Sequence, residues 1–246
     1  MRIMTNIRKI ISFFSRNLWQ LRSLPYTLYF NFHYLPFKQA IKLPILLYKP
    51  TLLRCAGSVK INANKIKYGM IRLGHNKCSI YPNTGIAFEN NGGTIIFEGT
   101  CLIGRDSYIS IGANATVSFG NRFECNAALK LASHYKMIFA DDVSFGFDCF
   151  VVDTDFHQLS CISSSMNIKD EKIAPYGPVL IGKGCWIGAK CTLLKNTVLP
   201  AFCVVGCSSL LNKKYDIPQY TLLAGIPAVC KKVGVYRNRD DDEIKY

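Results

Sequence analysis

The chain has 246 residues, of which 49% are hydrophobic, and its formal net charge is +14. This hydrophobic content suits a folded domain and excludes a chain that is disordered throughout. The positive charge is confined to the N-terminal third, because residues 1–88 contain 14 Lys and Arg and no Asp or Glu, whereas the rest holds 16 of each sign. The charge therefore belongs to one N-terminal surface and does not predict a nucleic-acid-binding protein.

Residues 1–50 are predicted to form a basic, amphipathic helical segment. Apolar side chains recur there at spacings of three and four residues, at Ile3, Ile7, Ile10, Phe14, Leu18 and Leu21. Such spacing is typical of one face of a helix. Basic residues interrupt it, so neither a secretory signal nor a membrane-spanning helix is expected. Two roles stay open and are compatible: the segment covers the open end of the following domain, or residues 1–24 contact an anionic membrane.

Strands are expected from about Val59, within a domain that covers residues 51–232. Large apolar residues appear there at a spacing of six, in three registers that start at Phe97, Ile111 and Phe139. Each change of register is expected to mark a corner that carries extra residues.

The clearest pattern runs from residue 179 to residue 211 and repeats every six residues. The large aliphatic position is filled by Ile181, Ile187, Leu193, Leu199, Val205 and Leu211. Four residues after the first five of these comes a small residue, at Cys185, Cys191, Thr197, Cys203 and Ser209. A period of six is typical of a parallel β-helix, in which three units complete one coil and both sets of side chains face inward. The sequence therefore predicts an all-β fold of stacked coils.

The cysteines fit the same interior. Several of the 11 cysteines occupy the small inward position, and no Cys-x-x-Cys motif occurs. A cysteine placed in this way acts as a small hydrophobic residue. Neither a disulfide framework nor a metal site is predicted, and we expect a reducing, cytoplasmic environment.

Residues 158–177 interrupt the repeat and are predicted to form an extended loop. Immediately before them stands Asp153-Thr154-Asp155-Phe156-His157. On a strand Asp155 and His157 would point to the same side, so that the carboxylate could orient the imidazole during proton transfer. The chemistry alone favours equally a catalytic base and a histidine that merely ends a strand, and it leaves open whether Asp153 or Asp155 supports the ring.

The stretch from His157 through Ile181-Gly182-Lys183-Gly184-Cys185-Trp186-Ile187-Gly188 resembles the hexapeptide-repeat acyltransferases, especially sugar O-acetyltransferases of the galactoside, maltose, O-antigen and capsule types. In that family a catalytic histidine precedes an extended loop, and an Ile-Gly-x-x-x-Trp-Ile-Gly coil follows it. The resemblance covers about residues 95–232 and implies a left-handed winding of the β-helix. It also implies His157 as the catalytic base and Asn126 as a candidate donor to the oxyanion. Asp155 is the candidate support for the imidazole from its position alone, with Asp153 as the alternative.

The same resemblance implies an acetyl-CoA donor and no metal. The positions that match the donor's contacts are Trp186, Gly188, Ala189, Gly206, Cys207, Lys213, Gly225, Pro227 and Lys232. Three residues depart from the family's usual pattern there, namely Cys207, Asn212 and Lys214. The resemblance further implies a homotrimer with the active site between subunits.

The expected function is acetyl-CoA-dependent O-acetylation of a sugar hydroxyl in surface-polysaccharide synthesis, on a saccharide acceptor held on a lipid at the inner face of the membrane. Two alternatives stay open: an N-acetyltransferase of a nucleotide-linked amino sugar and a non-catalytic β-helix scaffold. A carbonic anhydrase of the same fold is excluded because the four histidines lack the spacing of its metal ligands. Residues 233–246 form a charged tail, expected to be disordered from Arg237 onward.

Overall fold

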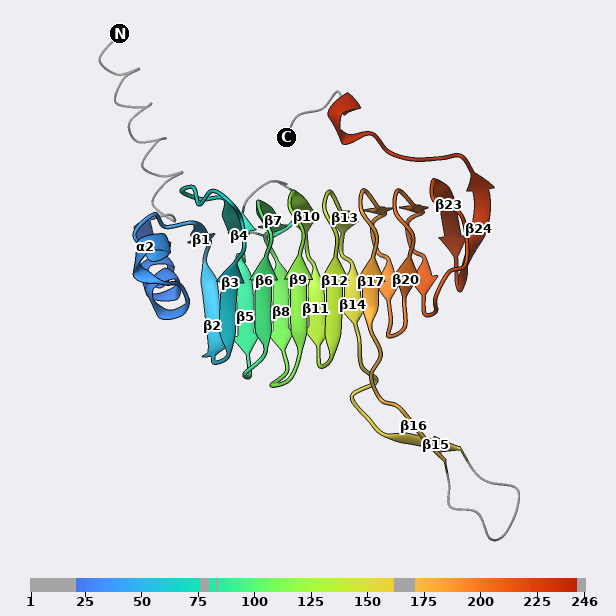
Figure 1. The fold of residues 1–246 in the computed structure, drawn as a ribbon, viewed down its shortest axis with the longest axis horizontal. Coiled ribbons are helices and arrows are strands. Elements are labelled where there is room, and N and C mark those ends of the chain that lie inside the picture. Colours follow the sequence, from blue (N-terminus) through green and yellow to red (C-terminus); the bar gives the residue numbers. More distant parts are fainter. Residues whose placement is uncertain (1–20, 76–79, 83, 162–170, 243–246) are drawn as a thin grey trace.

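The computed structural model describes residues 21–75, 80–82, 84–161 and 171–242. Its main body is a three-sided coil of short strands, in which strands one coil apart pair in parallel (Figure 1). Each side of the coil is one sheet, and the sheets are called A, B and C in the order in which the chain visits them. The corners are named after the sheets that they join.

The strand bounds follow from this winding among the described residues. Sheet A contains β1 (Ile45–Leu47), β4 (Ile71–His75), β7 (Cys101–Gly104), β10 (Phe123–Ala127), β13 (Ser144–Phe147), β18 (Trp186–Ile187), β21 (Val204–Val205), β23 (Thr221–Gly225) and β24 (Ala228–Val233). Sheet B contains β2 (Pro50–Cys55), β5 (Ile86–Asn90), β8 (Ser107–Ile111), β11 (Lys130–Ser133), β14 (Phe150–Val152), β19 (Thr192–Leu193) and β22 (Leu210–Leu211). Sheet C contains β3 (Ser58–Ile61), β6 (Thr94–Phe97), β9 (Thr116–Phe119), β12 (Lys136–Phe139), β17 (Val179–Ile181) and β20 (Val198–Leu199).

The core is built from side chains that stack from coil to coil. The six aliphatic residues of the C-terminal repeat are at most 3% exposed, and the five small residues between them at most 2%. The N-terminal coils place aromatic rings in the same inward position, and Phe97, Phe119 and Phe139 stack with centroids 5.4 and 5.5 Å apart. That distance is close to the spacing of paired strands, about 4.8 Å. The predicted repeat and its inward-facing residues are confirmed.

The corner between sheets A and B turns through one left-handed residue in each of five coils. These residues are Asp106, Ala128, Asp148, Lys190 and Ser208, with φ between 55° and 59°. A left-handed residue reverses the chain direction within a short link, so the corner repeats with little variation. Residues that follow sheet A strands are therefore stacked along one edge of the coil.

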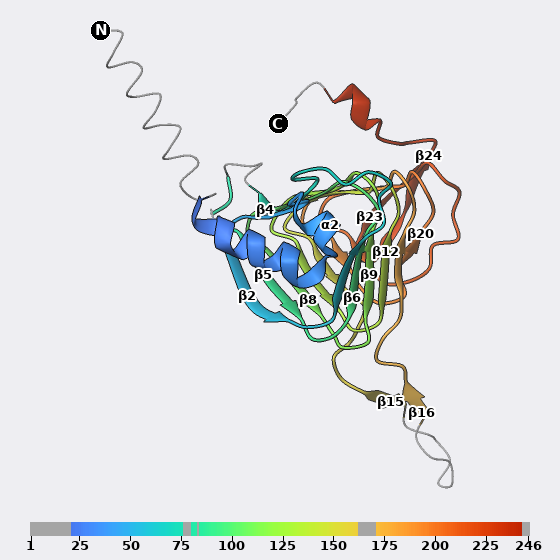
Figure 2. The ribbon, with the colours of Figure 1, turned by 60° about the vertical axis from the view of Figure 1, so that its left-hand side comes forward.

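Residues 21–40 cover the first coil. They form a helix over residues 21–34 and the short α2 (Phe37–Ala40), which lie across the open end of the coil (Figure 2). The amide of Asn31 accepts from Ile45 N at 3.2 Å and donates to Ile45 O at 2.7 Å, and the Thr27 hydroxyl accepts from Leu47 N at 3.1 Å. These bonds satisfy the exposed edge of β1, which is one of the two roles expected for this segment.

The coil begins earlier than predicted. β1 starts at Ile45 and β2 at Pro50, whereas the sequence placed the first strand near Val59 and the domain boundary at residue 51. Pro50 is the first residue of its strand, a position that proline tolerates.

The interruption after sheet B is a projecting arm. In its described part, β15 (Leu159–Cys161) pairs antiparallel with β16 (Glu171–Ile173), and the pair extends away from the coil (Figure 1). At the C-terminal end, β24 pairs antiparallel with β23 and covers the last edge of sheet A. None of the described helices has the length and apolar content needed to cross a membrane.

Candidate active site

The arm leaves the coil at the B–C corner that follows β14. Its base is a short two-stranded ladder, in which Gly177 N donates to Asp153 O at 2.9 Å and Asp155 N donates to Pro175 O at 2.7 Å. Thr154 lies between these bonds and bridges to the strand opposite. The ladder fixes the backbone of the segment that carries His157.

Asp153 belongs to the scaffold of this corner. Its carboxylate is fully buried and accepts hydrogen bonds from Ser133 Oγ at 2.6 Å, His134 N at 2.7 Å and Tyr135 N at 3.1 Å. These donors all come from the end of β11, one coil earlier. Asp153 therefore ties two successive coils together at the point where the arm departs.

Asp155 faces Lys195 rather than His157. The Lys195 ammonium lies 2.5 Å from Asp155 Oδ2 and 2.7 Å from Ala174 O. Phe156 has a left-handed φ of 60°, so the segment is no strand and the alternation that would place residues 155 and 157 on one side does not apply. The expectation that Asp155 orients the imidazole is therefore corrected.

His157 is exposed at the base of the arm. Within the described residues its ring has no hydrogen-bonding partner, and aromatic side chains surround the base of the arm. The ring of His134 meets Phe156 edge-on at 5.4 Å, and Tyr135 stacks on Tyr176 at 5.1 Å. An accessible imidazole beside exposed aromatic rings can accept a proton from a bound hydroxyl compound.

Lys195 is a residue of this site that was not predicted from the sequence. The signal that could have found it is the coil register. Val151 on β14 pairs with Leu193 on β19, so Lys195, two residues after Leu193, occupies the same place in its coil as Asp153, two residues after Val151. The inserted arm separates these residues along the chain and hides the relation.

Four of the nine residues predicted to contact the donor lie along one edge of the coil. Gly188 and Ala189 follow β18, and Gly206 and Cys207 follow β21, all at the A–B corner. A Cβ at Gly188 would lie 2.7 Å from Val205 O, so this glycine is required for the close approach of two coils. Cys207 is exposed.

The remaining donor positions are spread more widely. Gly225 and Pro227 form the turn between β23 and β24, and Gly225 N donates to Ser209 Oγ at 3.1 Å, which joins the turn to the A–B corner. Lys232 lies on β24, and Lys213 follows β22 at the B–C corner, with its ammonium 5.7 Å from the Tyr215 ring. The two lysines are therefore not grouped with the glycines at the A–B corner.

Trp186 is covered in part by the C-terminal tail. It lies on β18, is 38% exposed, and has the Arg237 guanidinium 5.1 Å from its ring centroid. Arg237 also donates to Ser144 Oγ at 2.9 Å. The tail thus contacts the Trp186 ring, which was predicted to contact the donor.

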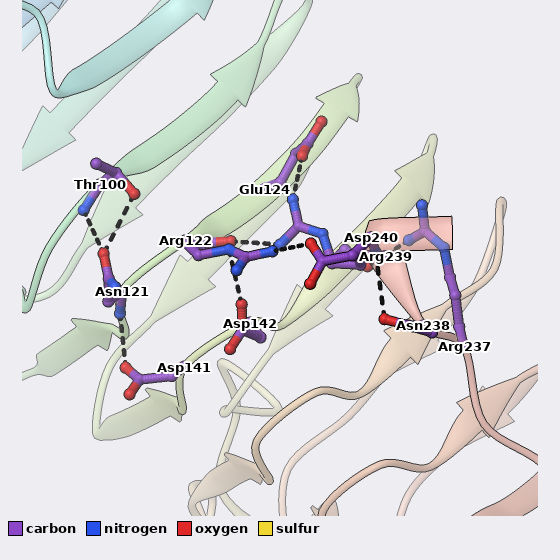
Figure 3. A network of polar contacts seen from close by, with 11 residues as sticks. Thr100, Asn121, Arg122, Glu124, Asp141, Asp142, Arg237, Asn238, Arg239 and Asp240 are labelled. Carbon is purple, nitrogen blue, oxygen red and sulfur yellow. Dashed lines mark hydrogen bonds and ion pairs between the residues drawn. The ribbon is translucent and has the colours of Figure 1, made fainter. Parts of the chain in front are cut away.

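The tail crosses the outer face of sheet A, against expectation. Beyond Arg237 it forms a 3-10 helix, η1 (Arg239–Asp241), and Arg239 reaches Glu124 at 2.5 Å (Figure 3). Arg122 lies between Asp142 at 3.0 Å and Asp240 at 3.3 Å. The prediction of disorder from Arg237 onward is wrong for residues 237–242, because these charges complement those on the face of the sheet.

Asn126 and His157 lie at different edges of the coil. Asn126 is on β10, near the A–B corner, whereas His157 follows β14 at the B–C corner. Sheet B separates the two edges, and a strand of four residues such as β11 spans about 13 Å. Within one chain, the base and the predicted oxyanion donor are therefore apart. Among the described residues, no group of three His, Cys, Asp or Glu could hold a metal ion.

Comparisons with known proteins identify acetyltransferases as relatives. The chain is 29% identical over 113 residues to a Mycobacterium tuberculosis protein named as an acetyltransferase, a match that covers 46% of this chain and 36% of that protein. It is 26% identical over 145 residues to Escherichia coli WbbJ, named as a lipopolysaccharide biosynthesis O-acetyl transferase, and this match covers 52% of this chain and 73% of WbbJ. The chain thus spans about a third of the first relative and most of the second. No protein-family model matches it.

A solved structure shows the same fold. The polySia-specific acetyltransferase NeuO superposes with a TM-score of 0.53 at 16% identity, over 80% of this chain and 92% of NeuO. At this level of identity the likeness is evidence for a shared fold. Together with the two relatives, it confirms the predicted resemblance to the hexapeptide-repeat acyltransferases.

Proposed function

We propose that the protein is an acetyl-CoA-dependent O-acetyltransferase that acts on a sugar hydroxyl in surface-polysaccharide synthesis. The observation that carries the proposal is the exposed His157 at the base of the arm, beside aromatic side chains that suit a saccharide ring. The similarity to WbbJ, named as an O-acetyl transferase, supports oxygen rather than nitrogen as the acceptor atom.

The proposed reaction is direct acyl transfer. His157 accepts the proton of the acceptor hydroxyl while the oxygen forms a bond to the thioester carbonyl carbon. The carbon–sulfur bond then breaks, and the proton passes from His157 to the departing thiolate. Asn126 offers an amide N–H to the oxyanion. Asp155 and Lys195 act on the backbone of the arm rather than on the imidazole.

A homotrimer with left-handed coils completes the proposal. His157 lies at the B–C corner, whereas Asn126, Gly188 and Cys207 lie at or near the A–B corner. If the B–C corner of one subunit meets the A–B corner of the next, base and donor face each other across the interface. The buried cysteines, which act as small core residues, support the proposed cytoplasmic location.

The test has two parts, and the first measures binding of the donor. We expect acetyl-CoA to bind with a Kd between micromolar and millimolar, about −8 to −4 kcal/mol. Bound donor should slow the alkylation of Cys207, while Cys161 on the arm, which is also exposed, serves as the internal control. The measurements are calorimetry and mass spectrometry of the labelled peptides.

The second part tests His157 in a saccharide-acceptor assay. We expect His157→Ala to lower kcat by about 10²- to 10⁴-fold and to leave acetyl-CoA binding unchanged. Loss of the transferred acetyl group under mild alkali would identify an ester, whereas an alkali-resistant product would indicate N-acetylation and contradict the proposal. Full transfer by the variant would exclude His157 as the base, and a folded protein that binds no acetyl-CoA would favour a scaffold.

A further inference from the structure

The helix over residues 21–34 turns a mixed face toward the coil, in which the buried Phe30 packs on Phe88 and three polar side chains lie beside it. Ser23, Thr27 and Asn31 are at most 4% exposed. The apolar side chains on the opposite side remain 40% to 54% exposed, namely Leu21, Leu24, Leu28 and Phe32. The outward face of a helix on the surface of a globular protein is usually polar instead.

The polar side has a structural explanation. Ser23, Thr27 and Asn31 bond to the backbone of the first coil, including a bond from Lys49 N to Ser23 Oγ at 3.0 Å. The open end of the coil is a row of backbone groups, so a polar helix face covers it well. The apolar side is therefore not used in holding the helix to the coil.

The exposed apolar side continues beyond the helix. The ring of Phe32 lies 6.0 Å from that of Phe37, which is 70% exposed, and Ile41 is 54% exposed. A groove alongside is lined by Pro25, Tyr26, Tyr29, Leu52 and Leu53. In the sequence, the same spacing of three and four residues runs back from Leu21 to Ile3. A continuous apolar surface of this kind indicates an interaction site.

The charge around this surface has one sign. Residues 21–75 contain nine Lys and Arg and no Asp or Glu. Lys38 and Lys42, next to Phe37 and Ile41 in the chain, are exposed, and Arg54 borders the groove. A second copy of this surface would bring like charges together, whereas an anionic lipid surface offers both an apolar layer and opposite charge.

We propose that residues 21–42 form a membrane-docking surface for anionic lipid. The apolar side chains enter the boundary between headgroups and acyl chains, and the basic side chains contact the phosphates. Because the helix is fixed to the coil by its inward face, docking places the first coil at the membrane. The docking does not depend on the proposed reaction, although it would bring an acetyltransferase close to a lipid-linked saccharide.

The test is flotation of the full chain with vesicles. We expect binding to vesicles of phosphatidylethanolamine and phosphatidylglycerol at low salt, weaker binding at high salt, and weak binding to pure phosphatidylcholine. Leu28→Ser/Phe32→Ser should lower the affinity by roughly tenfold or more, and Lys38→Glu/Lys42→Glu should remove most of the salt dependence. Val233→Ser is the matched control, since Val233 is 54% exposed on β24, at the opposite end of the coil.

Circular dichroism and solution mass establish that the variants stay folded with an unchanged subunit number. The proposal is overturned if the wild-type chain does not float with anionic vesicles, or if the Leu28/Phe32 variant floats as well as wild type. It is also overturned if that variant changes only the subunit number, because the surface would then be an interface between copies. Transfer to a soluble saccharide reports on the proposed reaction separately.

Discussion

At the scale of single residues, the geometry around His157 depends on one backbone angle. Phe156 between Asp155 and His157 has a left-handed φ, so strand alternation does not hold there, and the Asp155 carboxylate pairs with Lys195. Lys195 also donates to Ala174 O on the returning side of the arm. One ammonium thus holds both sides of the base of the arm, and Lys195 acts as a positioning residue.

Replacing Lys195 tests this role. We expect Lys195→Met to lower kcat on the order of tenfold, with little change in KM for acetyl-CoA, because His157 is less well held while the A–B corner is untouched. The pair is partly exposed, so the loss of stability should be only about 1 kcal/mol. Steady-state kinetics and urea unfolding are the measurements.

Lys172→Met is the matched control for Lys195→Met. Lys172 is an exposed lysine on the same arm, outside its base. Its replacement should change neither kcat nor the free energy of unfolding. Lys195→Arg should keep most of the activity, since a guanidinium can still meet the carboxylate. Equal effects of Lys195→Met and Lys172→Met would contradict a positioning role.

At the scale of elements, the C-terminal tail acts as a strap over sheet A. It joins Arg239 to Glu124 and Asp240 to Arg122 (Figure 3). Arg237 also covers the ring of Trp186. Each contact alone is modest, about 0.5 to 1 kcal/mol for the cation–π pair and up to about 1 for a partly exposed ion pair. Several contacts in a row order the segment.

Removing the tail should expose Trp186. In a Trp19→Phe background Trp186 is the sole tryptophan, so we expect deletion of residues 237–246 to shift its fluorescence to longer wavelength and to increase quenching by acrylamide. Arg237→Ala should produce part of the shift, and Arg239→Ala less, because Arg239 does not contact the ring. An emission spectrum unchanged by the deletion would show that the tail does not cover Trp186 in solution.

At the scale of the whole molecule, the coil interior contains a set of buried thiols. Burial raises the pKa of Cys149 to about 12 and also raises the pKa of Cys101 and of Cys125. In the unfolded chain a thiol has a pKa of about 8.5. Below that pH the thiols are protonated in both states. As the pH rises toward 12, only the unfolded state ionises, and the folded state loses stability.

The free energy of unfolding should therefore fall in alkaline solution. At one pH unit above 8.5, each buried thiol should lower it by about 1.4 kcal/mol. Urea unfolding between pH 7.5 and about 9.5 measures the slope, and Cys149→Ala should make it shallower by one thiol's share. Phe119→Leu, a fully buried substitution without a titrating group, should lower stability at every pH and keep the slope. Equal slopes in wild type, Cys149→Ala and Phe119→Leu would contradict the conclusion that buried thiols cause the loss of stability in alkaline solution.

The sequence by itself determined the coil. Positions such as Ile187 and Cys191 recur with a fixed period because each coil repeats the same inward geometry, and that local rule is visible along the chain. The repeat also located the arm, as the place where the period stops, and His157 at its start.

Only the tertiary structure decided which side chains meet. Asp155 pairs with Lys195, Arg239 with Glu124 and Thr27 with Leu47 across separations of 20 to 115 residues. No local periodicity encodes such pairs, because they depend on coil register, on one left-handed residue and on the way each end of the coil is covered. For the same reason the sequence showed an amphipathic N-terminal segment, but only the structure showed that its described helix turns Ser23, Thr27 and Asn31 inward and leaves apolar side chains exposed on the opposite side.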